Sequence, residues 1–238
     1  ITDGEFYNNE SFIKACENSK KNDTALHLIG LVSSGGIHSY NEHLYALIEL
    51  AHQQKVTRLY IHAFLDGRDV PYNSGINFIS KLQEKLKKIG IGTIASLSGR
   101  FWAMDRNNNW DRIKKAYDAI VFAKGHSSES SLKAVQDSYA NNRTDEFIYP
   151  TVISSYNGPK DGDGFLCLNF RSDRARQIMS AIASPTFKKF DVSKQPNWEL
   201  VTGMTKYSDE HSTFMSNLFS DKPINNTLGV WTSKHGYT

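Results

Sequence analysis

The chain has 238 residues, of which 39% are hydrophobic and 22% charged, and its 28 Lys and Arg against 25 Asp and Glu give a formal net charge of +3. Such a composition supports a sizeable core in one large domain or two small ones, and it excludes a disordered chain or a strongly basic tail. The apolar runs fall short of the roughly 18 to 20 residues of a membrane span, and two cysteines are too few for a disulfide framework. We therefore expect a cytoplasmic protein without membrane contact.

Hydrophobic spacing predicts an alternation of helices and strands along the chain. Helices are expected over 9–20, around 44–51, and over 73–88, 110–124, 130–140, 171–183 and 227–235, with strands over 25–32, 56–64, 91–97, 147–153, 165–170 and 200–204. Three consecutive strand–loop–helix units are typical of parallel βαβ architecture. The sequence therefore predicts an α/β fold, a three-layer domain with a mainly parallel sheet flanked by helices, in one compact unit over 1–238.

Cationic side chains follow four of the predicted strands. Ligands of open parallel sheets bind beyond the carboxyl ends of the strands, so these loops are the candidate site. We call the residues that they carry the arginine cage: His38, Arg68, Asp69, Arg100, Arg106, Arg171 and Arg174. The cage holds five of the nine arginines of the chain, whereas the lysines fall mostly on predicted helix faces and turns.

The residue types of the cage point to an anionic ligand. Arginine presents a planar fork of donors that matches carboxylate and phosphate oxygens, and five of them suit a ligand with both groups. Asp69 can orient an arginine, or bind a substrate hydroxyl and move its proton. Each signal also has a simpler interpretation: Arg68 and Asp69 as a local surface ion pair, His38 as a turn histidine bonded to backbone, and Arg171 with Arg174 as solvated charges.

Two acidic segments elsewhere have weaker signals. The segment 161–164, Asp-Gly-Asp-Gly, lacks the spaced ligands and final Glu of a calcium loop and is predicted to be a turn. The segment 209–211, Asp-Glu-His, is predicted to be a surface turn. The sequence thus predicts no metal ligands in this chain.

Four motifs then carry a resemblance. They are Gly-Leu-Val-Ser-Ser-Gly-Gly-Ile-His-Ser (30–39), His-Ala-Phe-Leu-Asp-Gly-Arg-Asp-Val (62–70), Ser-Gly-Arg-Phe-Trp-Ala-Met-Asp-Arg (98–106) and Asn-Phe-Arg-Ser-Asp-Arg-Ala-Arg-Gln (169–177). In sequence and order they resemble the cofactor-independent phosphoglycerate mutases, and the match covers essentially the whole chain.

The resemblance implies a glycolytic isomerase that interconverts 3-phosphoglycerate and 2-phosphoglycerate with two lobes. One lobe resembles alkaline phosphatase and carries a serine nucleophile and two metal ions, usually manganese. The other is the phosphotransferase lobe that holds the glycerate. The segments that carry the nucleophile and the metal ligands have no counterpart here, so the chain resembles the phosphotransferase lobe alone, and we expect it to be part of a longer enzyme.

Carried over by motif, the seven residues of the cage are expected to bind substrate, with Asp69 transferring protons at the glycerate hydroxyls. The chain departs from the family pattern at Ser34, where the family usually has Asp, and at Asn107 and Asn109, which replace an Asp and a basic residue. None of these changes removes an expected ligand. The implied partners are phosphoglycerate and the missing phosphatase-like lobe, and the implied state is a monomer.

Three classes of function stay open on the sequence. The first is the mutase lobe, which alone is expected to bind phosphoglycerate weakly without turnover. The second is a stand-alone phosphosugar-binding or regulatory module without catalysis. The third is a nucleic-acid binder that uses the arginines, and the near-balanced charge disfavours it.

Overall fold

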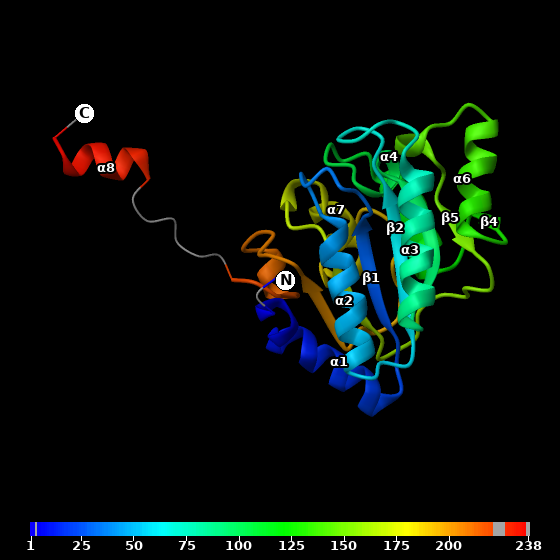
Figure 1. The fold of residues 1–238 in the computed structure, drawn as a ribbon, viewed down its shortest axis with the longest axis horizontal. Helices are drawn as coiled ribbons and strands as arrows, with labels where there is room; N and C mark the ends of the chain where they lie inside the picture. Colours follow the sequence, from blue (N-terminus) through cyan, green and yellow to red (C-terminus); the bar gives the residue numbers. More distant parts are fainter. Residues whose placement is uncertain (3, 221–226, 237–238) are drawn as a thin grey trace.

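An eight-stranded sheet with the order β4-β5-β3-β2-β1-β6-β7-β8 runs through the middle of the fold (Figure 1). The computed structural model describes residues 1–2, 4–220 and 227–236. The strands are β1 (Leu26–Leu31), β2 (Leu59–Leu65), β3 (Thr93–Gly99), β4 (His126–Ser128), β5 (Thr151–Ile153), β6 (Gly164–Cys167), β7 (Leu200–Gly203) and β8 (Ser216–Asn217). Every neighbouring pair is parallel except β3 with β5. The predicted α/β fold with a mainly parallel sheet is confirmed.

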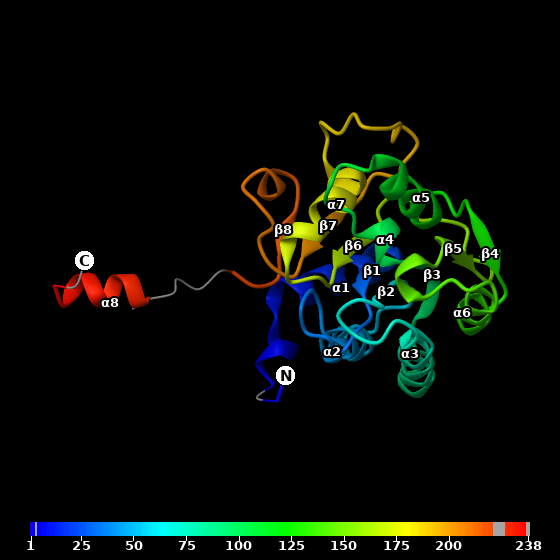
Figure 2. The same ribbon diagram turned by 90° about the horizontal axis from the view of Figure 1, so that it is seen from above.

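Helices cover both faces of this sheet, as Figure 2 shows from above. The described helices are α1 (Glu10–Asn22), α2 (Asn41–Gln53), α3 (Gly75–Ile89), α4 (Arg100–Ala103), α5 (Trp110–Val121), α6 (Ser131–Ala140), α7 (Arg176–Ala183) and α8 (Leu228–Lys234), with 3-10 turns η1 (Glu5–Asn8), η2 (Asp145–Phe147), η3 (Ser172–Arg174) and η4 (His211–Thr213). Buried side chains of α1, α2, α3 and α6 pack on one face, and those of α4, α5 and α7 pack on the other.

The two faces follow from the alternation of side chains along each strand. Leu28 of β1 joins the core under α2 and α3, whereas its neighbour Ile29 joins the core under α5 and α7. Both side chains are fully buried, as are all six residues of β1. A central parallel strand covered on both sides is largely apolar, which is why the run at 25–32 reads as a hydrophobic segment interrupted only by the buried His27 and by Gly30.

Local signals set the limits of the helices. The side chain of Asn9 accepts a hydrogen bond from the backbone N–H of Phe12 and so caps the start of α1. At the C-terminal end of α3, Gly90 adopts φ 85°, a left-handed conformation that costs glycine little. Between its ends, α3 buries Ile79, Leu82 and Leu86 at helical spacing. The sequence prediction for this helix is confirmed.

Several predicted elements differ in the structure. The strand expected over 147–153 is the 3-10 turn η2 followed by the short strand β5, which pairs antiparallel with β3. The helix expected over 171–183 begins with the 3-10 turn η3 and becomes α-helical only at Arg176. The strands β4 and β8 and the short helix α4 carry no periodic pattern, because they have only three, two and four residues. A hydrophobic period cannot be read from so few residues.

A row of polar side chains is buried within the face of the sheet that α5 covers. Asp163, the last residue before β6, lies 3.1 Å from His27 Nε2, and His27 Nδ1 lies 3.0 Å from His62 Nε2. The row ends on β3, where His62 Nδ1 lies 2.8 Å from Ser96 Oγ. The predicted turn at 161–164 is found at Asp161 and Gly162, whereas Gly164 begins β6, and Asp163 between them is 4% exposed and ends this row.

The carboxylate at one end decides where the protons of this row lie. Because an ionised Asp163 can only accept, His27 donates from Nε2, its Nδ1 accepts from His62 Nε2, and His62 Nδ1 accepts from the Ser96 hydroxyl. Burial lowers the pKa of both histidines, and both rings are fully buried. Both are therefore neutral in the folded protein.

The last described segment, α8, lies apart from the rest of the fold in Figures 1 and 2. The predicted helix over 227–235 is confirmed as Leu228–Lys234. The expected surface turn at 209–211 is only partly confirmed. Its last residue, His211, begins the 3-10 turn η4 and is only 3% exposed. The imidazole lies between two hydroxyl groups, with Nδ1 2.8 Å from Ser208 Oγ and Nε2 3.1 Å from Ser180 Oγ.

Candidate functional site

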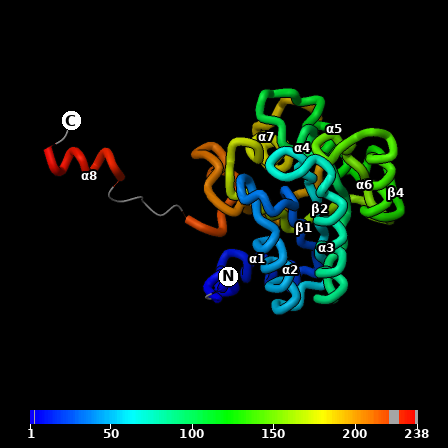
Figure 3. The backbone as a smooth tube through the Cα atoms, turned by 45° about the horizontal axis from the view of Figure 1, so that its top comes forward, coloured from blue at the N-terminus to red at the C-terminus, as the bar shows by residue number. Residues whose placement is uncertain are grey.

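The loops that follow β1, β2, β3 and β6 meet at the carboxyl edge of the sheet, the upper edge in Figure 1, which Figure 3 turns toward the reader. Backbone hydrogen bonds join loops that are distant in the sequence. The N–H of Phe170 in the β6 loop donates to the carbonyl oxygen of His38 in the β1 loop over 2.8 Å, and the N–H of Val32 after β1 donates to the carbonyl oxygen of Phe64 in β2 over 2.9 Å. The residues of the arginine cage come from these loops.

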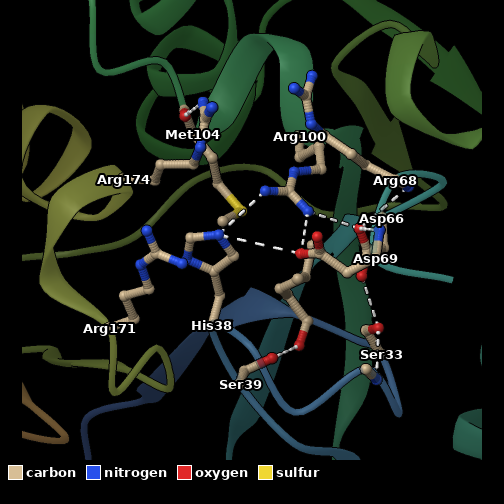
Figure 4. A network of polar contacts seen from close by, with 12 residues as sticks. Ser33, His38, Ser39, Asp66, Arg68, Asp69, Arg100, Met104, Arg171 and Arg174 are labelled. Carbon is tan, nitrogen blue, oxygen red and sulfur yellow. Dashed lines mark hydrogen bonds and ion pairs between the residues drawn. The ribbon is translucent and has the colours of Figure 1, made fainter.

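His38, Asp69 and Arg100 form the centre of the cage, and their side chains point toward one another in Figure 4. Arg100 Nη1 donates to Asp69 Oδ2 over 2.5 Å, and Arg100 Nη2 donates to His38 Nε2 over 3.0 Å. His38 Nε2 lies 3.9 Å from Asp69 Oδ2. Burial and the neighbouring guanidinium of Arg100 lower the pKa of His38 to about 4, against the opposing effect of the nearby carboxylates. The imidazole is therefore neutral at pH 7.

Asp66 lies behind this centre and is almost fully buried. Its Oδ1 accepts from Arg100 Nη1 over 2.6 Å and from the backbone N–H groups of Arg68 and Asp69 over 3.2 and 3.0 Å. Its Oδ2 accepts from the Ser33 hydroxyl over 2.7 Å. Burial alone would raise the pKa of Asp66, but the backbone, serine and arginine donors outweigh it and lower that pKa. Asp66 is thus a buried, ionised counterion.

Asp173 is likewise the carboxylate counterion of two more exposed arginines of the cage, Arg106 and Arg171. Its Oδ2 accepts from Arg106 Nη1 over 2.7 Å, and its Oδ1 lies 2.9 Å from Arg171 Nε. Its Oδ1 also lies 3.7 Å from His38 Nδ1. Burial opposes ionisation of Asp173, but Arg106, Arg171 and His38 together lower its pKa. The carboxylate joins the β3 and β6 loops without a ligand between them.

The two remaining arginines lie on opposite sides of the centre. Arg68 Nη1 lies 3.5 Å from Glu146 Oε1, and Arg174 Nη1 donates to the carbonyl oxygen of Met104 over 3.1 Å. Burial and the nearby guanidiniums lower the pKa of Arg174, which shows how densely positive charge is gathered there. The side chains of Arg68, Arg106 and Arg171 are 60%, 47% and 49% exposed, so each keeps donors for a ligand.

The structure thus brings all seven residues of the cage to one edge of the sheet. It does not pair Arg68 with Asp69: the carboxylate partner of Arg68 is Glu146, and Asp69 accepts from Arg100. Arg100 differs from the other cage arginines, because it is 3% exposed and its terminal nitrogens already donate to protein groups. Arg100 therefore orients its neighbours Asp66, Asp69 and His38.

Sequence reasoning missed the acidic residues that hold the cage. They are Asp66, Asp173 and Glu146. Asp66 and Asp173 stand within two residues of cage arginines in the same motifs, Leu-Asp-Gly-Arg and Arg-Ser-Asp-Arg, and that proximity is the signal that could have found them. Glu146 reaches Arg68 from η2, a contact between residues 78 apart that no local pattern shows.

The departures from the family pattern lie at exposed positions. Ser34 is exposed at the edge of the β1 loop, whereas the neighbouring Ser33 makes the bond to Asp66. The backbone N–H groups of Asn107 and Asn109 donate to Asp105 Oδ1, and the amide of Asn109 donates to Asp105 Oδ2 over 2.8 Å. The two asparagines therefore support the loop that carries Arg106.

The described ranges, 1–2, 4–220 and 227–236, contain no group of three or more His, Cys, Asp or Glu side chains placed to hold a metal ion. Within these same ranges, no helix has the length and apolar character needed to cross a membrane. Both cysteines are unpaired and buried, and burial raises the pKa of the Cys16 thiol to about 12 and that of the Cys167 thiol to about 11. Neither thiol is a nucleophile at neutral pH.

The site therefore gathers five guanidiniums and a neutral imidazole at one edge of the sheet. Fold and site together define an α/β domain with a cluster of arginines around a neutral histidine at the carboxyl edge of its sheet. The chain matches, over residues 1–209, the family model described as "BPG-independent PGAM N-terminus". It belongs to the family of 2,3-bisphosphoglycerate-independent phosphoglycerate mutases, of which it matches the N-terminal part.

Individual relatives agree with this assignment. The chain is 46% identical over 240 residues to the 2,3-bisphosphoglycerate-independent phosphoglycerate mutase of Clostridium acetobutylicum, and 43% identical over 240 residues to that of Clostridium perfringens. Each alignment covers 99% of this chain and 46% of the relative, so the chain spans about half the length of these proteins. A crystal structure of Leishmania mexicana phosphoglycerate mutase at low cobalt concentration superimposes with a TM-score of 0.88 and 29% identity, covering 99% of this chain and 45% of that one.

Proposed function

We propose that this chain is the phosphotransferase lobe, over 1–238, of a glycolytic phosphoglycerate mutase and that the arginine cage binds 2- and 3-phosphoglycerate. The observation that carries the proposal is the convergence of five arginines and a neutral histidine from four loops on one edge of the sheet. A phosphoglycerate has a phosphate and a carboxylate, and both fit the donor forks of Arg68, Arg106, Arg171 and Arg174.

Within that function, Asp69 at the centre of the cage has a different role from the more exposed arginines, Arg68, Arg106 and Arg171. Asp69 is held by Arg100 at 2.5 Å with about a fifth of its side chain exposed, so it can accept a proton from a glycerate hydroxyl and return it to the other. The outer arginines hold the charged ends of the ligand while it changes orientation. Interactions of this kind position the reacting oxygens and need no covalent bond to the cage.

The remaining half of the enzyme supplies the rest of the chemistry. By family resemblance, a serine of the phosphatase-like lobe takes the phosphate and returns it to the other hydroxyl, with two metal ions, manganese by the same resemblance, bound in that lobe. We propose that the partner of the cage is this lobe of the same protein, that the enzyme is a monomer in the cytoplasm, and that neither nucleic acid nor a membrane takes part.

The second candidate function is a stand-alone phosphosugar-binding or regulatory module. The cage supports it equally, since binding requires no serine nucleophile. The two functions differ in catalysis: a module binds in isolation and has no mutase half, whereas the lobe gains turnover when the remaining half is joined to it.

Calorimetric titration of the 238-residue chain with 3-phosphoglycerate tests the cage. We expect measurable binding, weakened at least tenfold by Arg171→Ala because a half-exposed guanidinium that faces the ligand is lost. Arg58→Ala is the matched control: Arg58 is also a half-exposed arginine paired with an aspartate, but it stands directly before β2, at the opposite edge of the sheet. Equal loss in both variants, or no binding by the parent chain, would refute the assignment, and manganese-dependent mutase activity of this chain alone would refute its role as a lobe.

A further inference from the structure

One residue outside the expected cage, Asp66, contacts two of the three residues at the centre of the site, Arg100 and Asp69. Its two oxygens accept from the Ser33 hydroxyl, from Arg100 and from the backbone N–H groups of Arg68 and Asp69. It is 2% exposed, so it makes these contacts without reaching the ligand. A buried carboxylate with that set of donors has one stable arrangement, because any rotation would leave a buried donor unsatisfied.

The position of Arg100 follows from that arrangement. Its guanidinium is held at one end by Asp66 at 2.6 Å and Asp69 at 2.5 Å, and the other terminal nitrogen reaches His38 Nε2 at 3.0 Å. Figure 4 shows the three partners arranged around this single group. Burial alone would lower the pKa of Arg100, but the two carboxylates outweigh it and raise that pKa. The group is a permanent donor.

The contact with His38 has a consequence for the imidazole. Arginine has donors only, so the nitrogen that it contacts must carry a lone pair and no proton. A neutral ring has one proton, which must then be on Nδ1. The groups that face the ring agree: Arg100 and Arg171 disfavour a second proton, and the carboxylates of Asp173 and Asp69 lie 3.7 and 3.9 Å away, beyond hydrogen-bond distance.

The proton on Nδ1 is available to a ligand. His38 Nδ1 is buried and makes no hydrogen bond to any part of the chain that the structure describes. A buried donor without a partner is costly, and an anionic oxygen in the cage would satisfy it. The Nε2–H tautomer could not do this, because its proton would point at the guanidinium.

We propose that Asp66 is a positioning residue that, through Arg100, fixes His38 as the Nδ1–H tautomer and so gives the cage a neutral donor for an anionic oxygen of the ligand. The ligand part of this inference rests on the proposed function. The tautomer part concerns the protein without ligand. It can therefore be refuted without refuting the proposed function, and the proposed function can be refuted without refuting it.

Nitrogen NMR of the ligand-free chain tests the tautomer directly, since long-range proton–nitrogen correlations distinguish a protonated from a bare ring nitrogen. The protein has eight histidines, and His38→Gln identifies the signal of His38 by its disappearance. We expect a bare Nε2 and a protonated Nδ1, unchanged from pH 8 to pH 5. A proton on Nε2, or a doubly protonated ring at pH 7, would overturn the inference.

Asp66→Asn tests the role of the carboxylate. We expect the His38 ring to become a mixture of tautomers and the dissociation constant for 3-phosphoglycerate to rise at least tenfold. Asp105→Asn is the matched control for the spectrum, because Asp105 is also buried and also accepts from two backbone N–H groups, a side chain and an arginine, yet does not contact Arg100. An unchanged His38 spectrum in Asp66→Asn would contradict the role of Asp66.

A second variant covers the case in which Asp66→Asn does not fold. Arg100→Lys keeps the charge but lacks the second terminal nitrogen that reaches His38. We expect the Nδ1–H tautomer to be lost in this variant, and its retention would overturn the inference. If the parent chain shows the expected tautomer but does not bind 3-phosphoglycerate, the proposed function fails and the tautomer assignment stands.

Discussion

Asp163 offers the most direct test of the buried polar row. Asp163→Ala removes the acceptor of two buried donors: the backbone N–H of Ala25, 2.7 Å from Oδ1, and His27 Nε2, 3.1 Å from Oδ2. It also removes the acceptor of the Lys160 N–H at 2.8 Å, but Lys160 is exposed, so water can replace that bond. Only the two buried donors are left without a partner.

The expected loss of stability follows from those two donors. Each buried group left unsatisfied costs about 1 to 3 kcal/mol, so we expect the free energy of unfolding to fall by about 2 to 6 kcal/mol. With an m-value of about 3 kcal/mol/M, the midpoint of urea unfolding falls by about 0.7 to 2 M. The assay is urea unfolding followed by tryptophan fluorescence, since Trp198 packs against Phe165 and His27 beside the row.

Asp161→Ala is the control in the same turn. Its exposed side chain accepts one hydrogen bond, from the N–H of Asn197 over 2.7 Å. We expect a loss of about 1 kcal/mol or less there. Equal losses in the two variants would refute the view that burial, and not the hydrogen bond as such, gives Asp163 its importance.

Two further predictions concern the same fold. Burial lowers the pKa values of His27 and His62, so as the pH falls below about 6.5 the unfolded chain takes up protons at these residues more readily than the folded one. We therefore expect the free energy of unfolding from urea titrations to be highest above that pH and to fall between pH 7 and pH 5. A flat profile would contradict this reasoning. In Gly99→Ala the new Cβ would collide with the main-chain carbonyl oxygen of Glu146, and we expect a loss of about 1 to 3 kcal/mol in thermal unfolding, whereas Gly229→Ala, with open space around it, should stay within about 0.5 kcal/mol of the parent.

The central βαβ units could be predicted from the sequence because their signals are local and long. The six buried residues of β1 and the helical spacing in α3 are each complete within one segment. Edge strands such as β4, His-Ser-Ser, have no hydrophobic alternation. Their pairing depends on neighbours, as with the parallel register that places Ser127 of β4 opposite Val152 of β5.

The candidate site divides in a similar way. The arginines could be found because parallel strands bring their following loops to one edge. The burial of Arg100 could not be predicted from the sequence. It depends on Asp66, which lies 34 residues earlier in the chain, and on the packing of α4. Whether a cationic residue contacts a ligand or orients its neighbours is decided by tertiary contacts alone.

The order of strands around β1 also bears on how the chain folds during synthesis. β1 is hydrogen-bonded on one side to β2 and on the other to β6, whose first residue, Gly164, lies 138 positions after Leu26. Until β6 leaves the ribosome, the apolar strand β1 keeps an open edge that can pair with another chain. Nascent chains that stop before Gly164 should therefore be the most prone to aggregate, and the same pairing that completes the core brings Arg171 to His38.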